Sequence, residues 1–266
     1  MADIIQIYNR KGGVAKTTSV IQLGGEFSKN FGKRVLLCDF DESGDLTASI
    51  AHSEKPEMFL PDMLVSYYMH DIEEDIHGAI CRTDFERLDL IPASAISMSN
   101  ALSDLTKDRL FSLAGCLDPF MEQIEDEYDI ILFDCGAGST DYDLMAMGSA
   151  DYLLIPTDDT TNSANQARRT ISDMKRFKRI ANPKLDFIGM YISIMHERRS
   201  VSKAVKELLM EKYQEKMIPI SIRDGAGIGN TGAMSAPLCY ALPSDNVAKD
   251  FHELAKYIIE YIGEGK

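Results

Sequence analysis

Seven short apolar runs, separated by longer amphipathic stretches, constrain the fold of this chain more than any other feature of its sequence. The runs cover residues 4–8, 35–40, 88–92, 130–134, 152–156, 187–194 and 217–222. They are almost continuously apolar rather than alternating, which is typical of strands buried on both faces of a parallel sheet. Helices must cover both faces of such a sheet, so the pattern predicts an α/β fold with a doubly wound, mostly parallel sheet.

The stretches between these runs supply the expected helices. They lie at 17–31, 97–126, 162–180, 200–215 and 245–262. In the last stretch Val247, Phe251, Leu254 and Ile258 recur every three or four residues and therefore share one helix face. Neither a low-complexity linker nor a repeat interrupts the pattern, so we expect one domain over residues 1–266.

Composition excludes several classes of protein. The net charge of −14 argues against a surface coated in basic residues for nucleic acid or anionic membrane, although a local basic patch remains possible. The five cysteines are odd in number and form no CxxC pair, which excludes a zinc ribbon or a secreted disulfide framework and favours the cytoplasm. The chain starts without the basic and long apolar segments of a signal peptide, and its apolar runs are too short to span a bilayer.

A glycine-rich turn with two lysines and two threonines follows the first apolar run. Residues 9–18 read NRKGGVAKTT and lead into an amphipathic stretch. A strand, such a turn and a helix N-terminus form a phosphate cradle, because backbone N–H groups and the helix dipole face the anion. We expect Lys16 to contact the β/γ-phosphates and the Thr17 hydroxyl to bind Mg²⁺. The full set expected around the nucleotide is Lys11, Gly12, Gly13, Val14, Ala15, Lys16, Thr17 and Thr18.

The segment KGGVAKTT closely resembles the deviant Walker A motif, KGGVGKTT, of the ParA/MinD superfamily of P-loop ATPases. The resemblance implies ATP and Mg²⁺ as cofactors and an ATP-dependent homodimer. It also gives Lys11 a catalytic role across the dimer interface at the partner's nucleotide, where a cation stabilises the phosphoryl group being transferred. Ala15 stands where the family has glycine, so it needs either a negative φ or a strained backbone.

Two acidic motifs also resemble those of the family. Residues 35–47, VLLCDFDESGDLT, are similar to its LLIDxDPQGNxT motif, which implies that Asp41 orients or deprotonates the attacking water near Mg²⁺. Residues 128–139, YDIILFDCGAGS, resemble its Walker B strand, which implies that Asp134 holds Mg²⁺ through water. Both aspartates follow apolar runs, and ligands of open α/β sheets bind at the carboxyl ends of the strands.

The resemblance extends over nearly the whole chain and weakens in the C-terminal third. Ser193 occupies a position that lies near the adenine in the family. Residues 217–236 are richer in glycine than the corresponding family region, and the GxGxxG spacing within 227–232 is not followed by the helix that NAD binding requires. ParA-type proteins often bind nonspecific DNA through arginines of this region. The candidates here are Arg198, Arg199, Lys203 and Arg223, with the basic run 168–179 as a second choice.

The resemblance also bears on the partners and location of the chain. The P-loop begins close to residue 1, so we expect no N-terminal helix-turn-helix domain and a separate, centromere-binding ParB-like partner. The last residues, KYIIEYIGEGK, include Glu260 and Glu264 and lack the basic face of a membrane-targeting helix, so we expect no membrane partner. The expected location is the cytoplasm and the nucleoid.

We interpret the sequence as a dimerising Mg-ATPase of plasmid or chromosome partition. In this interpretation ATP is hydrolysed to ADP and phosphate slowly without the partner, the ATP state binds nonspecific DNA, and partner-stimulated hydrolysis releases it. Three alternatives remain open: a MinD-like positioning ATPase, an enzyme of small-molecule metabolism on the same fold, and a nucleotide-binding regulatory module with little turnover. Ala15 and the altered loop after Asp134 favour the last of these. The sequence identifies neither the replicon nor the cargo.

Overall fold

The computed structural model describes residues 1–50, 52–107, 112–138, 140–225 and 235–264. Within these ranges, eight strands form one sheet in the order β3-β4-β2-β5-β1-β6-β7-β8. All neighbouring strands are parallel except β3 and β4, which are antiparallel. The strands are β1 (Asp3–Ile7), β2 (Val35–Phe40), β3 (Cys81–Arg82), β4 (Leu88–Ile91), β5 (Ile130–Cys135), β6 (Tyr152–Asp158), β7 (Asp186–Met195) and β8 (Met217–Arg223). The predicted doubly wound, mostly parallel sheet is therefore confirmed.

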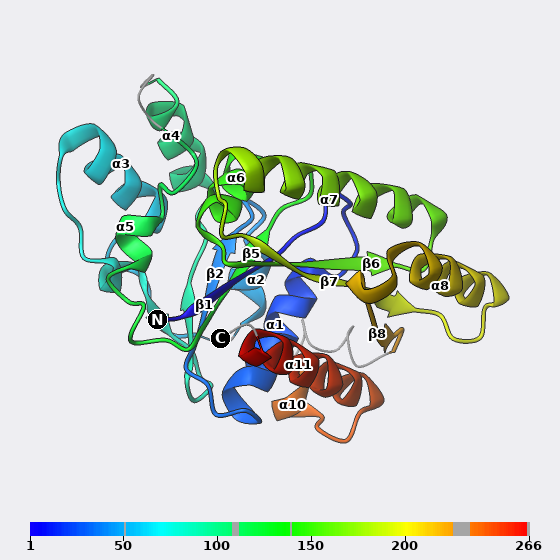
Figure 1. Ribbon diagram of the computed structural model, residues 1–266. Coiled ribbons are helices and arrows are strands. Elements are labelled where there is room, and N and C mark those ends of the chain that lie inside the picture. The colour runs from blue at the N-terminus through cyan, green and yellow to red at the C-terminus, as the bar shows by residue number, and fades with distance from the viewer. Residues whose placement is uncertain (51, 108–111, 139, 226–234, 265–266) are drawn as a thin grey trace.

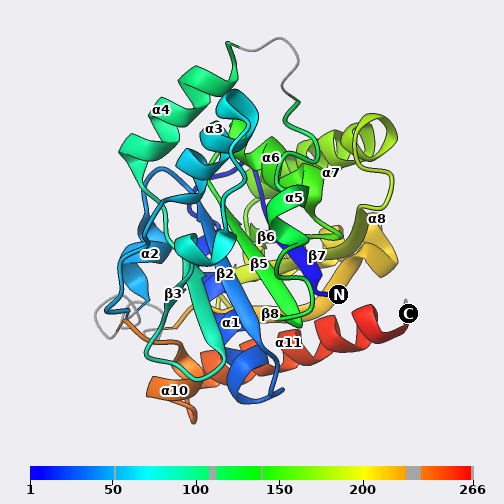
Figure 2. The same ribbon diagram turned by 90° about the vertical axis from the view of Figure 1, so that its left-hand side faces the viewer.

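Helices cover both faces of this sheet (Figures 1 and 2). One face carries α1 (Lys16–Lys29), α2 (Asp45–Ser49), α10 (Leu238–Ala241) and α11 (Asn246–Glu264). The other carries α3 (Leu60–His70), α4 (Ala95–Leu105), α5 (Asp118–Met121), α6 (Asp141–Ser149), α7 (Thr161–Ile180) and α8 (Ser200–Tyr213). The short 3₁₀ turns η1 (Ile76–Ala79) and η2 (Gln214–Lys216) precede β3 and β8. The chain therefore folds as three layers with the sheet in the middle.

The buried strands explain why their sequences are continuously apolar. Every residue of β2 and β5 is buried, and successive side chains enter the two opposite hydrophobic clusters. Leu36 of β2, for example, packs under the α3–α8 layer, whereas Leu37 packs under α1 and α11. Gly24 lets α1 lie close to the sheet, because a Cβ atom there would come within 2.7 Å of the Leu37 side chain. The central strands are thus held from both sides.

Most expected elements are confirmed, and the exceptions have clear physical reasons. All seven predicted strands are present, while the two-residue β3 is too short to give a periodic signal. The helix expected over 97–126 is wrong, because α4 ends at Leu105 and α5 covers only Asp118–Met121. Gly115, with a φ of 73°, and Pro119 at the start of α5 break the pattern between them. None of the described helices is long and apolar enough to cross a membrane.

Candidate active site

The glycine-rich loop crosses the carboxyl edge of the sheet between β1 and α1. Its first residue, Asn9, is buried and ties the loop to β6, because its side-chain nitrogen donates to the Pro156 carbonyl at 2.8 Å. The Asn9 side-chain oxygen accepts a hydrogen bond from the Lys11 amide at 3.1 Å. The backbone at the head of the loop is therefore fixed by its own side chain and by the neighbouring strand.

Ala15 adopts the left-handed conformation that glycine usually supplies. Its φ and ψ are 56° and 40°, and it forms the N-cap of α1 without a side-chain hydrogen bond. Its carbonyl accepts the first helical bond, from the Ser19 amide at 2.9 Å. Of the two possibilities expected for Ala15, the structure shows the strained one, which costs about 1–2 kcal/mol.

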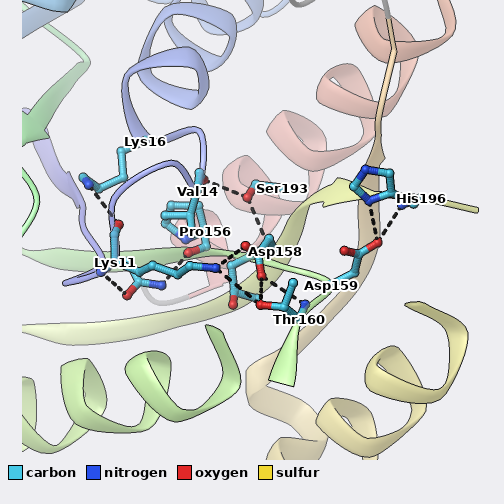
Figure 3. A network of polar contacts seen from close by, with 11 residues as sticks. Lys11, Val14, Lys16, Pro156, Asp158, Asp159, Thr160, Ser193 and His196 are labelled. Carbon is cyan, nitrogen blue, oxygen red and sulfur yellow. Dashed lines mark hydrogen bonds and ion pairs between the residues drawn. The ribbon is translucent and has the colours of Figure 1, made fainter. Parts of the chain in front are cut away.

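Lys16 folds back over the loop rather than into solvent. It is 8% exposed, and its Nζ donates to the carbonyl of Lys11 at 3.3 Å (Figure 3). Thr17 and Thr18 follow in the first turn of α1 and are partly exposed, whereas the side chain of Val14, a residue of the loop itself, is buried. The expected phosphate-binding residues therefore lie together around the N-terminus of α1, where an anion is favoured.

Asp134 lies on β5 next to Asp39 of β2 and is fully buried. Among the described residues, neither carboxylate oxygen of Asp134 has a hydrogen-bond partner of good geometry, although the Thr17 hydroxyl lies near enough to favour its ionised form. Burial first, and then the charge of Asp39, raise the pKa of Asp134 well above its ordinary value, while Lys16 opposes this shift. A buried carboxylate without a partner beside a threonine hydroxyl fits a magnesium site.

Asp39 and Asp41 differ in how they are held. Asp39 is buried, and one of its carboxylate oxygens accepts bonds from the amide and hydroxyl of Thr47 at 2.9 and 2.6 Å. Asp41 is partly exposed and lies against the loop after β5, because a Cβ atom on Gly136 would come within 3.5 Å of its carboxylate carbon. Asp41 is therefore the acid at the open side of the site, where a water molecule can reach it.

The loop after β5 packs against the glycine-rich loop and is closed by a helix cap. A Cβ atom on Gly12 would lie 3.5 Å from that of Ala137, and the Gly138 amide donates to the Arg10 carbonyl at 3.0 Å. At its far end, the buried Asp143 accepts a hydrogen bond from the Thr140 amide at 2.7 Å and completes a capping box for α6. Asp143 was not predicted as part of the site, although the Thr-x-x-Asp spacing is a signal for such a cap.

Ser193 lies beneath the loop in this structure. It is buried on β7, and its hydroxyl is within hydrogen-bonding distance of the carbonyls of Val14, at 2.8 Å, and Thr157, at 3.0 Å. Its hydroxyl therefore contacts the backbone of the phosphate loop at Val14 (Figure 3). A place for Ser193 near the adenine stays a prediction.

Lys11 is engaged within its own chain. Its Nζ forms an ion pair with the Asp158 carboxylate at the end of β6 and donates to the Thr160 hydroxyl at 3.3 Å (Figure 3). The sequence analysis did not identify Asp158, because nothing in the local sequence marks an aspartate at a strand end as the partner of a distant lysine. The cross-dimer role expected for Lys11 therefore requires its side chain to leave this carboxylate.

His196, a third residue that was not predicted from the sequence, joins three loops at the same edge of the sheet. Its amide and Nδ1 both contact the buried Asp159 after β6, at 2.7 and 2.9 Å, and its Nε2 lies 3.5 Å from Asp224 after β8. His196 is itself the first residue after β7, so it connects the loops that follow β6, β7 and β8. Burial raises the pKa of Asp159, but hydrogen bonds from His196 and Ser202 outweigh it, so the pKa lies below its ordinary value.

The candidate DNA-binding residues fall into two groups. Arg198, Arg199 and Lys203 are exposed at the start of α8. Arg223 instead forms two 2.7 Å bonds with Asp250 of α11, which also raise its pKa. The Arg223 side chain, which is 37% exposed, is therefore already paired with Asp250 of its own chain. The GxGxxG segment at 227–232 lies outside the described residues, and so does Ser139 in the loop after β5.

The sequence of this chain is similar to those of known proteins. The AAA_31 family, described as an AAA domain, matches residues 2–187. The sporulation initiation inhibitor protein Soj of Bacillus subtilis is 26% identical over 259 residues, which are 97% of this chain and 98% of Soj.

Solved structures resemble the whole chain. Cobyrinic acid a,c-diamide synthase from Mycobacterium smegmatis, bound to an ATP analogue and magnesium, gives a TM-score of 0.82 at 22% identity and covers 100% of this chain and 97% of that one. The septum site-determining protein MinD from Pyrococcus horikoshii, complexed with Mg-ADP, gives 0.78 at 20% identity and covers 100% and 99%. The chain therefore belongs to the AAA_31 family and is a P-loop ATPase of the ParA/MinD type.

Proposed function

We propose that this protein binds Mg-ATP at the carboxyl edge of β1, β5 and β2 and hydrolyses it to ADP and phosphate. One observation carries the proposal: the buried carboxylate of Asp134, which has no hydrogen-bond partner of good geometry within the described part of the chain, lies beside Thr17 and within the electrostatic influence of Lys16. Magnesium bound there would supply charge neutralisation for the phosphates and a template for their orientation. The cobyrinic acid a,c-diamide synthase and MinD structures, which hold an ATP analogue with magnesium and Mg-ADP, support it.

The residues of this chain divide the work as follows. Amides of the glycine-rich loop and the Lys16 ammonium bind phosphate oxygens, while the Thr17 hydroxyl and, through water, Asp134 hold the metal. Asp41, which is partly exposed beside Gly136, orients the attacking water and accepts its proton. Asp39 is held by Thr47 and so fixes the start of the loop that carries Asp41.

We assign this ATPase to plasmid or chromosome partition, as an ATP-dependent homodimer that works with a centromere-binding partner. The similarity to Soj over 97% of this chain, and to the chromosome partitioning protein ParA of Caulobacter vibrioides over 83% of it, supports this assignment. The exposed cations Arg198, Arg199 and Lys203 supply the proposed contact with nonspecific DNA. Closure of the dimer doubles the number of these cations on one assembly.

Turnover tests the catalytic assignment. We expect Asp41→Ala to keep Mg-ATP binding and to lower kcat at least about 100-fold, because the carboxylate acts on the water rather than on the bound nucleotide. Nucleotide affinity by calorimetry and phosphate release by a coupled assay give the two quantities. Asp45→Ala, a nearby acidic residue at the start of α2, is the matched control and should leave kcat unchanged. Hydrolysis at the wild-type rate in Asp41→Ala would assign the water to another residue.

DNA retention tests the partition assignment. With ATP in the Asp41→Ala background, we expect retention on nonspecific DNA at 50 mM salt that falls about 100-fold at 200 mM, if about four phosphates are contacted. Reversing the charge of Arg198 and Arg199 should abolish it, whereas the same reversal at the exposed Lys249 and Lys256 of α11, on the other face of the sheet, should not. An ATP dimer that ignores DNA at the lower salt would contradict the partition assignment and favour a regulatory role.

A further inference from the structure

The contact between Lys11 and Asp158 joins two parts of the chain that are far apart in sequence. It satisfies both charges in the monomer, but it occupies the lysine that the proposed dimer needs. Within one protomer it neutralises both charges. In the dimer that we propose, the same lysine has to reach the nucleotide of the partner. We propose that Asp158 is a positioning residue for Lys11, which it holds inside its own protomer and thereby opposes ATP-dependent dimerisation. This inference rests on the dimer of the proposed function.

Hydrogen bonds from its own loop hold the carboxylate of Asp158 in position for the lysine. The amide and hydroxyl of Thr160 both donate to its Oδ1 atom, at 3.0 and 2.6 Å, while Lys11 contacts Oδ2. These local bonds do not involve the lysine, so they hold the carboxylate in place whether or not Lys11 is bound. Asp158 is therefore a fixed acceptor at the end of β6 rather than a mobile surface charge.

The backbone of Lys11 is held by contacts that do not involve its own side chain. Its amide donates to the Asn9 side chain at 3.1 Å, and its carbonyl accepts from Lys16 at 3.3 Å. A side chain anchored in this way can exchange one anionic partner for another without moving the loop. A single ammonium is also a compact charge, so it cannot serve Asp158 and a phosphate in another protomer together.

Burial makes this contact stronger than a typical surface pair. The side chains of Lys11 and Asp158 are 22% and 14% exposed, compared with 35% and 37% for Arg10 and Asp173, the neighbouring ion pair at the head of the loop. Partly buried charges are screened less by salt and water. Opening the contact therefore costs more than opening an exposed pair, and that cost is subtracted from the stability of the dimer.

The test measures dimerisation with ATP by analytical ultracentrifugation in the Asp41→Ala background, where turnover does not consume the dimer. We expect Asp158→Asn to lower the dimer dissociation constant about fivefold for each contact opened, or about 25-fold for the two in a symmetric dimer. Asp173→Asn is the matched control, because it removes the adjacent ion pair, and it should leave the constant unchanged. A constant that is unchanged or raised in Asp158→Asn would overturn the proposal, since a residue that supports Lys11 in the dimer would weaken it when removed.

A second measurement separates this inference from the proposed function. In the absence of nucleotide, thermal unfolding of Lys11→Met, Asp158→Asn and the double variant should show that the two substitutions are not additive. Additive effects would overturn the cis contact even if the ATP dimer forms. Non-additive effects without an ATP dimer in any variant would keep the cis contact but contradict both its role against dimerisation and the dimer of the proposed function. A normal ATP dimer in Lys11→Met would contradict the cross-dimer role of Lys11.

Discussion

The carboxyl edge of the sheet has two halves, which differ in whether their acidic side chains have basic partners. Around β2, β5 and β1, the buried Asp134 has no cationic partner of good geometry among the described residues, and its pKa is raised. Around β6, β7 and β8, three acidic side chains have basic partners within the chain. The pairs are Lys11 with Asp158, His196 with Asp159, and Arg223 with Asp250.

This difference suggests that the first half binds the nucleotide, whereas the second half responds to it. The first half is incomplete as it stands, because a buried carboxylate is costly unless a cation arrives with the ligand. In the second half these three acidic side chains already have partners, so a ligand that binds one of the paired groups has to replace its partner. We infer that nucleotide binding completes the first half, whereas any conformational response appears as exchange of ion pairs in the second.

The largest expected effect comes from removing the cation that serves the first half. We expect Lys16→Ala to weaken Mg-ATP binding at least about 100-fold, because the loop loses the ammonium that contacts the β/γ-phosphates. Calorimetry on the variant measures the loss. Lys29→Ala, at the other end of α1, is the control and should bind normally. Unchanged affinity in Lys16→Ala would mean that the two halves do not differ as described.

The next effect concerns the carboxylate itself. The raised pKa of Asp134 means that its contribution to stability is fully present at low pH and is lost as the pH rises through its folded-state value. We therefore expect Asp134→Asn to stabilise the nucleotide-free protein near neutral pH by about 1–3 kcal/mol, or about 2–4 °C in Tm for each kcal/mol.

With magnesium bound, we expect the wild-type protein to be stabilised more than Asp134→Asn. The metal is held through water by the ionised carboxylate, so its binding displaces any proton on Asp134, and the stabilisation of the wild-type protein by Mg-ADP should grow as the pH rises through the raised pKa of Asp134. Asp134→Asn should lose most of the magnesium-dependent part at every pH. Differential scanning fluorimetry with and without Mg²⁺ gives both results. A lower Tm for the nucleotide-free variant would show that the wild-type carboxylate already has a partner.

The second half offers a contrasting case in Arg223. Its two bonds to Asp250 are internal, so we expect Arg223→Gln to cost about 1–2 kcal/mol of stability and to leave DNA retention at the wild-type level. Urea denaturation and the retention assay measure the two effects. Asp250→Asn should lose a similar amount of stability. Loss of DNA retention in Arg223→Gln at full stability would place this arginine on the DNA surface after all.

The two halves also differ in how far the sequence predicts them. The glycine-rich loop, Asp41 and Asp134 follow apolar runs directly, so contiguous residues are enough to predict the fold and the first half. The partners of Lys11 and Arg223 lie 147 and 27 residues away. Such pairs depend on strand order and on which helix covers which face, and local patterns contain neither. The split between α4 and α5 was missed for a related reason, because apolar spacing alone does not show where Gly115 turns the chain.

The smallest effect concerns the strain stored at the border of the two halves. Ala15 has a φ of 56°, a conformation that costs an alanine about 1–2 kcal/mol and a glycine almost nothing. Glycine also makes the unfolded chain more flexible, which removes about 0.4–1 kcal/mol of that gain. We therefore expect Ala15→Gly to stabilise the nucleotide-free protein by about 0.5–1 kcal/mol, measured by urea denaturation. Gly13→Ala, at a φ of 71°, is the mirror control and should destabilise it by a similar amount. If Ala15→Gly brought no gain while Gly13→Ala caused a loss, Ala15 would be supported by contacts that repay its strain.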